Sequence, residues 1–251
     1  MWHKPHVLNA LADLLFVVGG AALLAVAAVW LVRMPSLPVR QVVFAHELQH
    51  VRRVEVEQAL PAALKGNFFS VNLEAVRAAL EKLPWVRRVE VRRVWPSRLE
   101  VRVEEHRPAA RWEESRGTAR GELVNSFGEV FAASLPEADA AGLPVLHGPQ
   151  GTAPDLLKRY GEFVEAFRPV GLRPVQILLS PRLSWQLRLE NGMAVDLGRE
   201  QPKSPLGVRL ARFIAVYPDT VGKRAVQPAV VDLRYPNGFA MRGAATEGKE
   251  K

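Results

Sequence analysis

An uncharged apolar run near the N-terminus is the feature that most constrains this chain. Leu14 to Val32 reads LLFVVGGAALLAVAAVWLV, nineteen residues without a charge, an Asn or a Gln. A helix of that length spans roughly the ~30 Å hydrocarbon layer of a bilayer. An Arg or Lys at its centre would cost about 3 kcal/mol, and the run contains neither. It therefore predicts a transmembrane helix at 14–32, and no later run of this length lacks charges.

Two other interpretations of the run are a buried core helix and a cleaved signal peptide. Ala25-Val26-Ala27 is a small-x-small pattern that a signal peptidase accepts. The apolar run continues past it to Val32, however, and is longer than the ~7 to 15 apolar residues of a signal peptide. We therefore expect a retained anchor. The flanking charges do not choose its orientation, because Lys4 lies on one side and Arg33 and Arg40 lie on the other.

Composition limits the possibilities for the rest of the chain. About 215 residues remain after the anchor, enough for one large or two small domains, and we favour two. The absence of cysteine excludes disulfides, cysteine-based zinc sites and thiol chemistry. A net charge of +8 and a pI near 10.2 would suit nucleic acid, an anionic membrane surface or an acidic partner. Arg alternates with Glu in strand-like segments, however, so solvated strand faces are the simpler interpretation.

The first part after the anchor predicts a small domain of the order β-α-α-β-β. Residues 1–13 form a short leader and 33–38 a proline-containing linker. Val39 to Ala45 suits a strand, and a helix follows at about 54–64, although Pro61 would break or kink it. Asn72 can cap the next helix, which Pro84 ends. Alternating valines and leucines on either side of Pro96-Ser97 then predict two strands, so that two helices cover one face of the sheet.

The sequence motifs of this part resemble a known module. They are Leu83-Pro84-Trp85-Val86, Val91-Arg92-Arg93-Val94-Trp95-Pro96 and Glu105-His106-Arg107-Pro108-Ala109-Ala110-Arg111-Trp112. They resemble the POTRA module of the FtsQ family of bacterial cell-division proteins, called DivIB in Gram-positive bacteria. POTRA modules of outer-membrane assembly proteins are usually repeated before a β-barrel. Here one copy follows a membrane anchor, which favours the FtsQ family.

The second part predicts further strands and two helices. Glu122 to Ala132 suits a hairpin, and Leu143 to Thr152 suits a turn-rich loop. A helix starts at Thr152 or Ala153 and stops before Pro169, and another starts at Ser204-Pro205. Asn191-Gly192 between alternating runs predicts a hairpin. Ala229 to Arg242 predicts two strands around Pro236-Asn237-Gly238, and the polar 243–251 predicts a disordered tail.

Five further segments extend the resemblance into the β domain of the same family. They are Leu143 to Gly151, Ser184-Trp185-Gln186-Leu187, Val195-Asp196-Leu197-Gly198-Arg199, Arg209-Leu210-Ala211-Arg212-Phe213 and Val231-Asp232-Leu233-Arg234-Tyr235. We therefore expect an α+β protein with one N-terminal transmembrane helix, a POTRA domain at 39–106 and a β domain at 107–242. The β domain should be a mixed antiparallel sheet with helices on one face.

No constellation of residues motivates catalysis. His46 and His50 stand four apart, as metal ligands on a helix do, but no third ligand supports them. Glu104 and Glu105 are adjacent, so in a strand they point to opposite faces and cannot form a close acid–base pair. His147 before Gly148-Pro149 suits a loop, and there is no G-x-S-x-G, P-loop or G-x-G-x-x-G motif. We expect a protein without enzymatic activity, cofactor or metal.

Binding is easier to motivate. If Val230 to Tyr235 or Phe239 to Arg242 lies at a sheet edge, its free backbone groups can pair with a partner strand. Arg234 and Tyr235, on opposite faces of such a strand, would then contact an acidic and an apolar partner residue. In the alternative, Tyr235 packs in the hairpin and Arg234 is solvated.

The resemblance implies a specific partner. The family holds FtsB, itself complexed with FtsL, through the last part of its β domain, and its Arg-Tyr pair matches Arg234 and Tyr235. A further contacting Arg of the family corresponds to Arg182, although Pro181 and Leu183 depart from the family pattern. The expected partner-binding residues are Arg234, Tyr235, Asn237, Gly238, Phe239 and Arg182.

The resemblance also implies function and location. We expect a divisome scaffold in the inner membrane, with a cytoplasmic N-terminus and a periplasmic body, that links early and late division proteins at the septum. POTRA and the transmembrane helix would contact other divisome proteins, and no nucleic acid is expected. The competing interpretations are an anchored envelope protein that binds anionic glycan or lipid through Arg-rich strands, and an anchored hydrolase.

Overall fold

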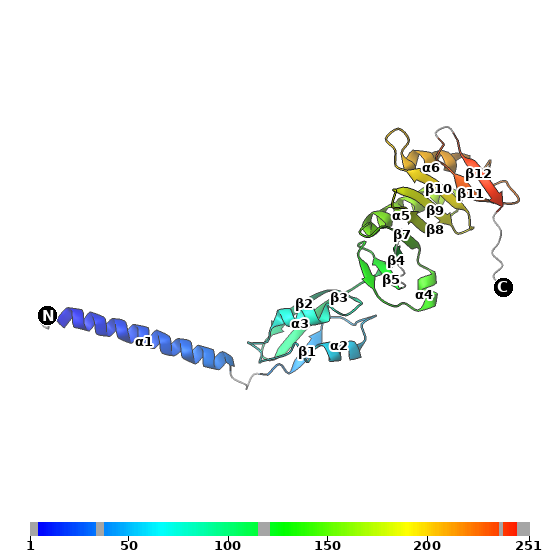
Figure 1. Cartoon of the computed structure of the whole chain (residues 1–251). Coiled ribbons are helices and arrows are strands. Elements are labelled where there is room, and N and C mark those ends of the chain that lie inside the picture. Colours follow the sequence, from blue (N-terminus) through cyan, green and yellow to red (C-terminus); the bar gives the residue numbers. More distant parts are fainter. Residues whose placement is uncertain (1–4, 34–37, 115–120, 236–237, 245–251) are drawn as a thin grey trace. The chain divides into compact units, whose positions relative to one another are not determined.

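A computed structural model describes residues 5–33, 38–114, 121–235 and 238–244 of the chain (Figure 1). The chain separates into two compact units, Met1–Glu105 and His106–Lys251. The division falls within one residue of the boundary expected between the POTRA domain and the β domain. Each unit is described by itself.

The N-terminal apolar run forms one long helix. Helix α1 covers Pro5–Arg33, and its segment Asn9–Ala27 is long and apolar enough to cross a membrane. None of that segment is buried, and large apolar side chains such as Leu15, Phe16 and Leu23 are exposed along it. A core helix would bury such side chains, so the exposure excludes that interpretation and supports a single-pass membrane protein.

The rest of the first unit has the order β-α-α-β-β, as expected. Its elements are β1 (Gln41–Phe44), α2 (Arg53–Ala59), α3 (Leu73–Leu80), β2 (Val86–Val94) and β3 (Arg98–Glu105). The sheet order is β1-β3-β2, with β1 parallel and β2 antiparallel to β3. The Asn72 side chain accepts a hydrogen bond from the Ala75 N–H and caps α3, as predicted. Helix α2 ends at Ala59 and is shorter than the predicted 54–64, because Pro61 cannot continue it.

The last residue of β3 fixes a loop of this unit. The Glu105 carboxylate accepts hydrogen bonds from the backbone N–H groups of Gln49 (2.9 Å), His50 (3.0 Å) and Val51 (2.8 Å). Burial by itself would raise the pKa of Glu105, but these donors outweigh burial and leave the pKa below its ordinary value. Glu105 therefore holds the connection between β1 and α2 against the end of β3.

The second unit is one nine-stranded mixed sheet with helices. Its elements are β4 (Pro108–Glu114), β5 (Glu122–Asn125), β6 (Val130–Ala132), α4 (Glu137–Ala141), β7 (Val145–Gly148), α5 (Ala153–Phe167), η1 (Arg168–Val170), β8 (Pro174–Leu179), β9 (Ser184–Leu189), β10 (Ala194–Arg199), α6 (Leu206–Val216), β11 (Pro228–Asp232) and β12 (Ala240–Ala244). The strand order is β12-β11-β10-β9-β8-β7-β4-β5-β6. The pairs β4–β7, β7–β8 and β10–β11 are parallel, and the others are antiparallel.

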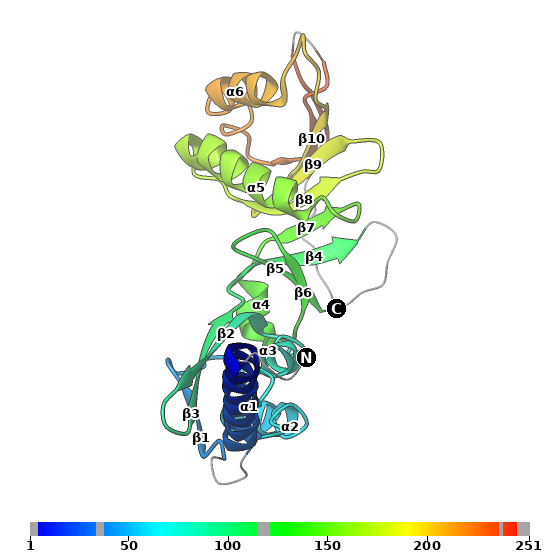
Figure 2. The same cartoon turned by 90° about the vertical axis from the view of Figure 1, so that its left-hand side faces the viewer.

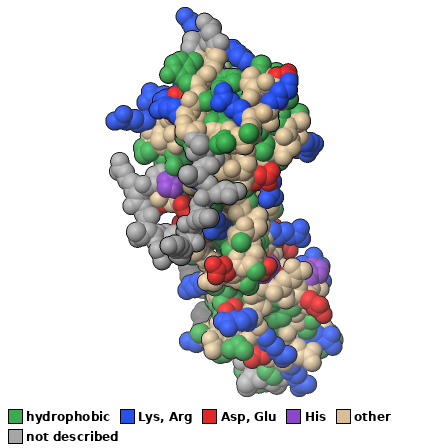
Figure 3. Space-filling view, turned by 90° about the vertical axis from the view of Figure 1, so that its right-hand side faces the viewer, with side chains coloured by type: hydrophobic (Ala, Val, Ile, Leu, Met, Phe, Trp, Pro, Cys, Tyr) green, Lys and Arg blue, Asp and Glu red, His purple; other side chains and the backbone are tan. Residues whose placement is uncertain are grey.

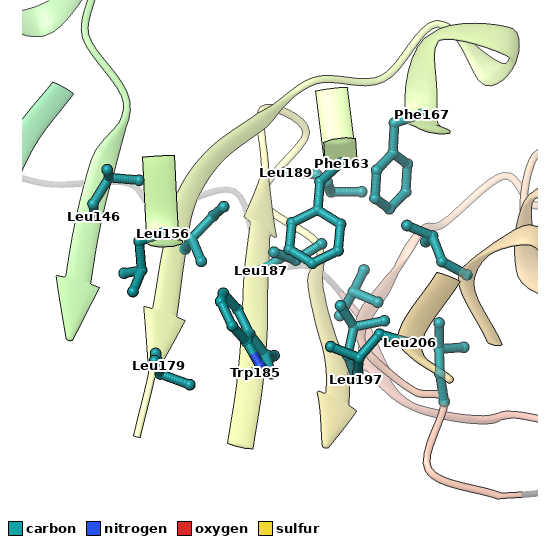
Figure 4. Close-up of a cluster of buried hydrophobic side chains, with 14 of the residues drawn as sticks. Leu146, Leu156, Phe163, Phe167, Leu179, Trp185, Leu187, Leu189, Leu197 and Leu206 are labelled. Carbon is teal, nitrogen blue, oxygen red and sulfur yellow. The ribbon is translucent and has the colours of Figure 1, made fainter. Parts of the chain in front are cut away.

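Helices α5 and α6 lie on the same side of strands β8 to β10 (Figure 2). Both helices place an apolar stripe on the sheet, and Figure 4 shows Phe163, Phe167 and Leu206 directed toward Trp185, Leu187 and Leu197 of the strands. These side chains are buried in one continuous core. The other face of the sheet carries polar side chains, as the alternation of Trp185, Gln186, Leu187 and Arg188 shows. The α+β fold class is therefore confirmed.

Several stretches of this unit differ from the sequence prediction. Residues 143–152 were expected to form a loop, but Val145–Gly148 is strand β7, paired in parallel with β4 and β8. Leu146 is fully buried there, which outweighs the turn propensity of the flanking Pro and Gly residues. Strand β8 was not predicted either, because its run PVQILL is nearly continuous in apolar residues and lacks clear alternation.

Strand β4 and the short helix α4 were not predicted either, whereas the other predicted elements agree with expectation. The β5–β6 hairpin, helix α5, the β9–β10 hairpin and helix α6 form where predicted. Strands β11 and β12 pair antiparallel, with Val230 opposite Arg242. Strand β12 reaches Ala244, two residues into the segment expected as a tail, and residues 245–251 lie outside the described residues.

Candidate functional site

Strand β12 forms one edge of the nine-stranded sheet. It pairs with β11 on one side, and no other described strand pairs with it. Strand β11 lies between β10 and β12, so of the two alternatives for the edge, Val230 to Tyr235 is excluded and Phe239 to Arg242 is supported. Edge strands present unpaired N–H and C=O groups that can pair with a strand from another chain.

Arg234 follows the end of β11 and is held by a buried carboxylate. Its Nε and Nη2 donate to Oδ1 and Oδ2 of Asp232, at 2.9 and 2.6 Å, and its Nε lies 3.4 Å from Oδ2 of Asp196. Asp232 is 1% exposed, whereas the Arg234 side chain is 53% exposed. The two aspartates are neighbours across the parallel β10–β11 pair. Arg234 is thus neither simply solvated nor free, because it neutralises a buried acid and keeps an outer edge in solvent.

The electrostatics of this group follow from those contacts. The hydrogen bond from Arg234 lowers the pKa of Asp232, although burial opposes the shift. The same bond, together with the charge of Asp196, raises the pKa of Arg234. Arg234 also lies against the backbone, since a Cβ on Gly198 would come within 2.8 Å of its Cγ. Gly198 has a φ of +69°, so both its conformation and this close approach require glycine.

Tyr235, in the connection between β11 and β12, lies next to Arg234 but outside any strand. Because β11 ends at Asp232, strand alternation does not place these two side chains on opposite faces, contrary to expectation. Tyr235 is 53% exposed, which excludes the interpretation that it packs inside the hairpin. An exposed aromatic side chain beside a half-exposed Arg is typical of a protein-binding surface.

The other expected residues of this connection have different surroundings. Phe239 is half-buried, and its ring packs edge-on against Phe213 of α6, with the ring centroids 5.3 Å apart. Its ring therefore anchors the start of β12 to the core. Gly238 is half-buried, and no heavy atom would lie within 4 Å of a Cβ added to it. Asn237 lies outside the described residues.

Arg182 lies elsewhere, in the turn between β8 and β9. It lines a hollow of about 810 Å³ together with Lys158, Arg199 and Glu200, and Arg234 is not part of that lining. Ser184, which begins β9, pairs with Arg199, which ends β10. Since β11 runs parallel to β10, Arg182 and Arg234 lie at the same end of the sheet. The structure thus brings them to one end of the sheet without placing them in one cluster.

Sequence reasoning missed three charged residues that build this end of the sheet. Asp232 is buried, Arg242 of β12 donates to Asp232 at 3.2 Å, and Arg209 of α6 is buried and donates to the carbonyls of Leu197 and Arg199. Burial lowers the pKa of Arg209, and the charges of Glu200 and Asp196 oppose that shift. A charged residue inside an apolar strand, as in Val230-Val231-Asp232-Leu233, is the signal that could have revealed the buried acid.

The charged groups do not resemble a catalytic or metal centre. Within the described residues, no three His, Asp or Glu side chains are grouped so that they could hold a metal ion. Nδ1 of His147 lies 3.7 Å from a carboxylate oxygen of the exposed Glu113, which is too far for a hydrogen bond. His50 stacks on Trp85, with the ring centroids 4.2 Å apart.

Comparison with known proteins gives the family directly. Residues 37–106 match the family model "POTRA domain, FtsQ-type", and residues 110–234 match "Cell division protein FtsQ/DivIB, C-terminal". The cell division protein FtsQ of Burkholderia pseudomallei is 38% identical over 244 residues, covering 97% of this chain and 95% of that protein.

Two further relatives carry the same name. FtsQ of Nitrosospira multiformis is 36% identical, covering 97% of this chain and 99% of the relative. FtsQ of Neisseria gonorrhoeae is 31% identical over 251 residues, covering 100% and 98%. These proteins are membrane-anchored and act in cell division without enzymatic activity. The chain therefore belongs to the FtsQ/DivIB family of bacterial cell-division proteins.

Proposed function

We propose that this chain is a divisome scaffold that holds an FtsB/FtsL-like complex by strand addition to β12. In this role it would link early and late division proteins at the septum, with its N-terminus in the cytoplasm and its two domains in the periplasm. The transmembrane helix and the POTRA domain would contact other division proteins. The protein would do no chemistry itself.

The observation that carries the proposal is the free edge of β12 beside Tyr235 and Arg234. Backbone hydrogen bonds along the edge would supply affinity, and contacts of the Tyr235 and Arg234 side chains would supply specificity for the partner. Tyr235 offers an exposed ring for an apolar contact. Arg234 donates to Asp232 through Nε and Nη2, and the remaining N–H groups of Nη1 and Nη2, on its outer edge, would donate to a carboxylate of the partner. Gly238 would let a partner strand approach, since no heavy atom lies within 4 Å of a Cβ added to it, while Phe239 anchors the start of β12. Asn237 is the further expected contact and lies outside the described residues.

The test is a binding measurement on the full chain in detergent micelles, with the FtsB-like protein of the same bacterium as the probe. Tyr235→Ala should weaken binding at least tenfold, because an exposed aromatic anchor at the centre of an interface contributes about 2 kcal/mol or more. The matched control is Phe127→Ala, an exposed aromatic near the opposite edge of the sheet, and it should bind as the wild type does. Unchanged affinity of Tyr235→Ala would count decisively against the site.

Arg182 has a separate place in the proposal. It would contact the part of the partner that lies beyond the strand, at the hollow between α5 and the β8–β9 turn. Arg182→Ala should then weaken binding less than Tyr235→Ala does, because a rim charge contributes about 1 kcal/mol or less. Equal affinity of Arg182→Ala and the wild type would remove Arg182 from the site and leave the strand addition standing.

The alternative function is binding of an anionic glycan or lipid through the Arg-rich strands. On the face that Figure 3 shows, Lys and Arg side chains are interspersed with acidic and hydrophobic ones, not gathered in one patch. Arg92 and Arg87 of β2 are paired with Glu100 and Glu104 of β3, which reduces their capacity for an outside anion. Salt distinguishes the two functions: glycan or lipid binding should fall steeply with ionic strength, whereas strand addition with an apolar anchor should persist.

A further inference from the structure

Arg242 on the edge strand shares a carboxylate with Arg234. Its Nη2 donates to Oδ2 of Asp232 at 3.2 Å, and Nη2 of Arg234 donates to the same oxygen at 2.6 Å. Asp232 is 1% exposed, whereas the Arg242 side chain is 66% exposed. One buried acid therefore joins the connection after β11 to the edge strand and brings two guanidinium groups together.

Donors outnumber acceptors in this cluster. Each guanidinium carries five N–H donors, so the two arginines offer about ten, while Asp232 and Asp196 are the carboxylates that the structure places beside them. In the described part of the chain, Nε and Nη1 of Arg242 have no hydrogen-bond partner. Both arginines thus present unused donors to solvent, held in place from behind by Asp232. Paired donors of this kind suit a carboxylate.

The register of β12 indicates which residue of an added partner strand would supply such a carboxylate. Met241 packs against the core on the helix-covered face, so Arg242 points to the open face of the sheet. A strand added beside β12 would place one residue directly opposite Arg242, with the two Cβ atoms about 4.5 to 5.5 Å apart. Its next residue along the strand would lie on the other face, near Met241.

We propose that Arg242 is a specificity-determining residue of the β12 edge, and that the partner strand carries an Asp or Glu opposite Arg242 and an apolar residue next to it, facing Met241. The inference rests on the proposed strand addition and adds the chemistry of the strand. Asp232 is the positioning residue of the pair, because it orients both guanidinium groups without reaching the partner.

The test measures binding of the FtsB-like protein of the same bacterium to the full chain in detergent micelles. Arg242→Gln should weaken binding about three- to tenfold, and Arg242→Glu should weaken it at least tenfold. The loss should shrink as salt is raised to 1 M, because partly exposed charges are screened. Hydrogen exchange of β10 and β11 should change little in Arg242→Gln, because Arg234 keeps its two hydrogen bonds to Asp232, and this separates a binding effect from a folding effect.

Arg188 provides the matched control. It lies on β9 in the same cross-strand row of the open face, because Arg188 is opposite Ala194, Ala194 opposite Val230, and Val230 opposite Arg242. Arg188 is exposed and lies three strands inward from the edge, about 14 Å from Arg242. Arg188→Gln and Arg188→Glu should bind within twofold of the wild type. On the partner, changing the correct acidic residue to Arg should restore binding to Arg242→Glu and to no other variant.

The outcomes separate this inference from the proposed function. If the wild-type chain does not bind the FtsB-like protein, the proposed function is refuted and the inference with it. If the wild type binds, and both Arg242 variants bind as tightly, the inference alone is wrong. It is also overturned if the Arg188 variants lose as much affinity as the Arg242 variants, or if no acidic residue of the partner can be exchanged to rescue Arg242→Glu.

Discussion

Removing Arg234 should damage the fold as well as the binding surface. Asp232 is 1% exposed, and Arg234 supplies two of its charge-assisted hydrogen bonds, at 2.9 and 2.6 Å. In Arg234→Ala the buried carboxylate keeps Arg242, at 3.2 Å, and the backbone N–H of residue 234, at 3.1 Å. Because Asp232 is buried, Arg234 stabilises the fold as well as forming part of the binding surface.

The magnitude follows from those contacts. A hydrogen bond to a charged group contributes about 1.5 to 3 kcal/mol, and a buried acid left without a partner costs more. Because the Arg234 side chain is half-exposed and Arg242 remains, solvent and the second arginine reduce the loss. We expect Arg234→Ala to lower the free energy of unfolding of the β domain by about 1 to 3 kcal/mol. Arg234→Glu should cost more, because it adds a third carboxylate beside Asp232 and Asp196.

The assay is hydrogen–deuterium exchange of the full chain in detergent micelles, read separately for peptides of β10, β11 and the POTRA strands. Arg234→Ala should speed exchange in β10 and β11 and leave β2 and β3 unchanged. Tyr235→Ala, the neighbouring control, should leave all of them unchanged, because its exposed ring contributes at most about 0.5 kcal/mol. Protection of β10 and β11 equal to the wild type in Arg234→Ala would refute the stabilising role of Arg234.

Three further predictions concern stability. Arg234 lowers the pKa of Asp232, so the stability that the Asp232 carboxylate contributes is complete above the ordinary Asp pKa of about 3.9 and is lost as pH falls through its lower folded pKa. In an acid titration followed by circular dichroism, Arg234→Ala should lose less stability over that pH range than the wild type does. Gly198→Ala should lower the melting temperature of the β domain, because the added Cβ would lie 2.8 Å from Arg234 Cγ and φ is +69°; Gly161→Ala, where a Cβ meets nothing within 4 Å, is the control. Glu105→Gln should destabilise the POTRA domain by about 1 to 2 kcal/mol in urea unfolding, because three N–H groups donate to two carboxylate oxygens and an amide offers only one acceptor oxygen. The control, Glu104→Gln, loses only a surface ion pair with Arg87 and should cost under about 1 kcal/mol.

Elements with strong local signals could be predicted from the sequence. Asn72 and Pro84 bracket α3, Pro154 begins α5, and Asn191-Gly192 turns the β9–β10 hairpin, and each is a property of a few neighbouring residues. Strands β7 and β8 could not be predicted this way. Both lie inside the sheet. Strand β7 is held by parallel pairing with β4 and β8, which are distant in the chain. Strand β8 also pairs antiparallel with the neighbouring β9, but its nearly continuous apolar run lacks the alternation that marks a strand.

The candidate site divides in the same way. Tyr235 and Arg234 could be identified from the family motif, and the edge position of Phe239 to Arg242 was one of two alternatives. The sequence could not show that Asp232 is buried and holds both Arg234 and Arg242, because their meeting depends on the register of β11 against β10 and β12. For the same reason it could not show that Phe239 packs on Phe213 of α6.

The measurement that tests the central claim most directly is hydrogen–deuterium exchange of the full chain with and without the FtsB-like protein. Strand addition predicts that the backbone amides of β12, Ala240–Ala244, become strongly protected when the partner binds, while those of β6, at the opposite edge of the sheet, do not change. Binding that leaves the exchange of β12 unaltered would contradict strand addition at this edge.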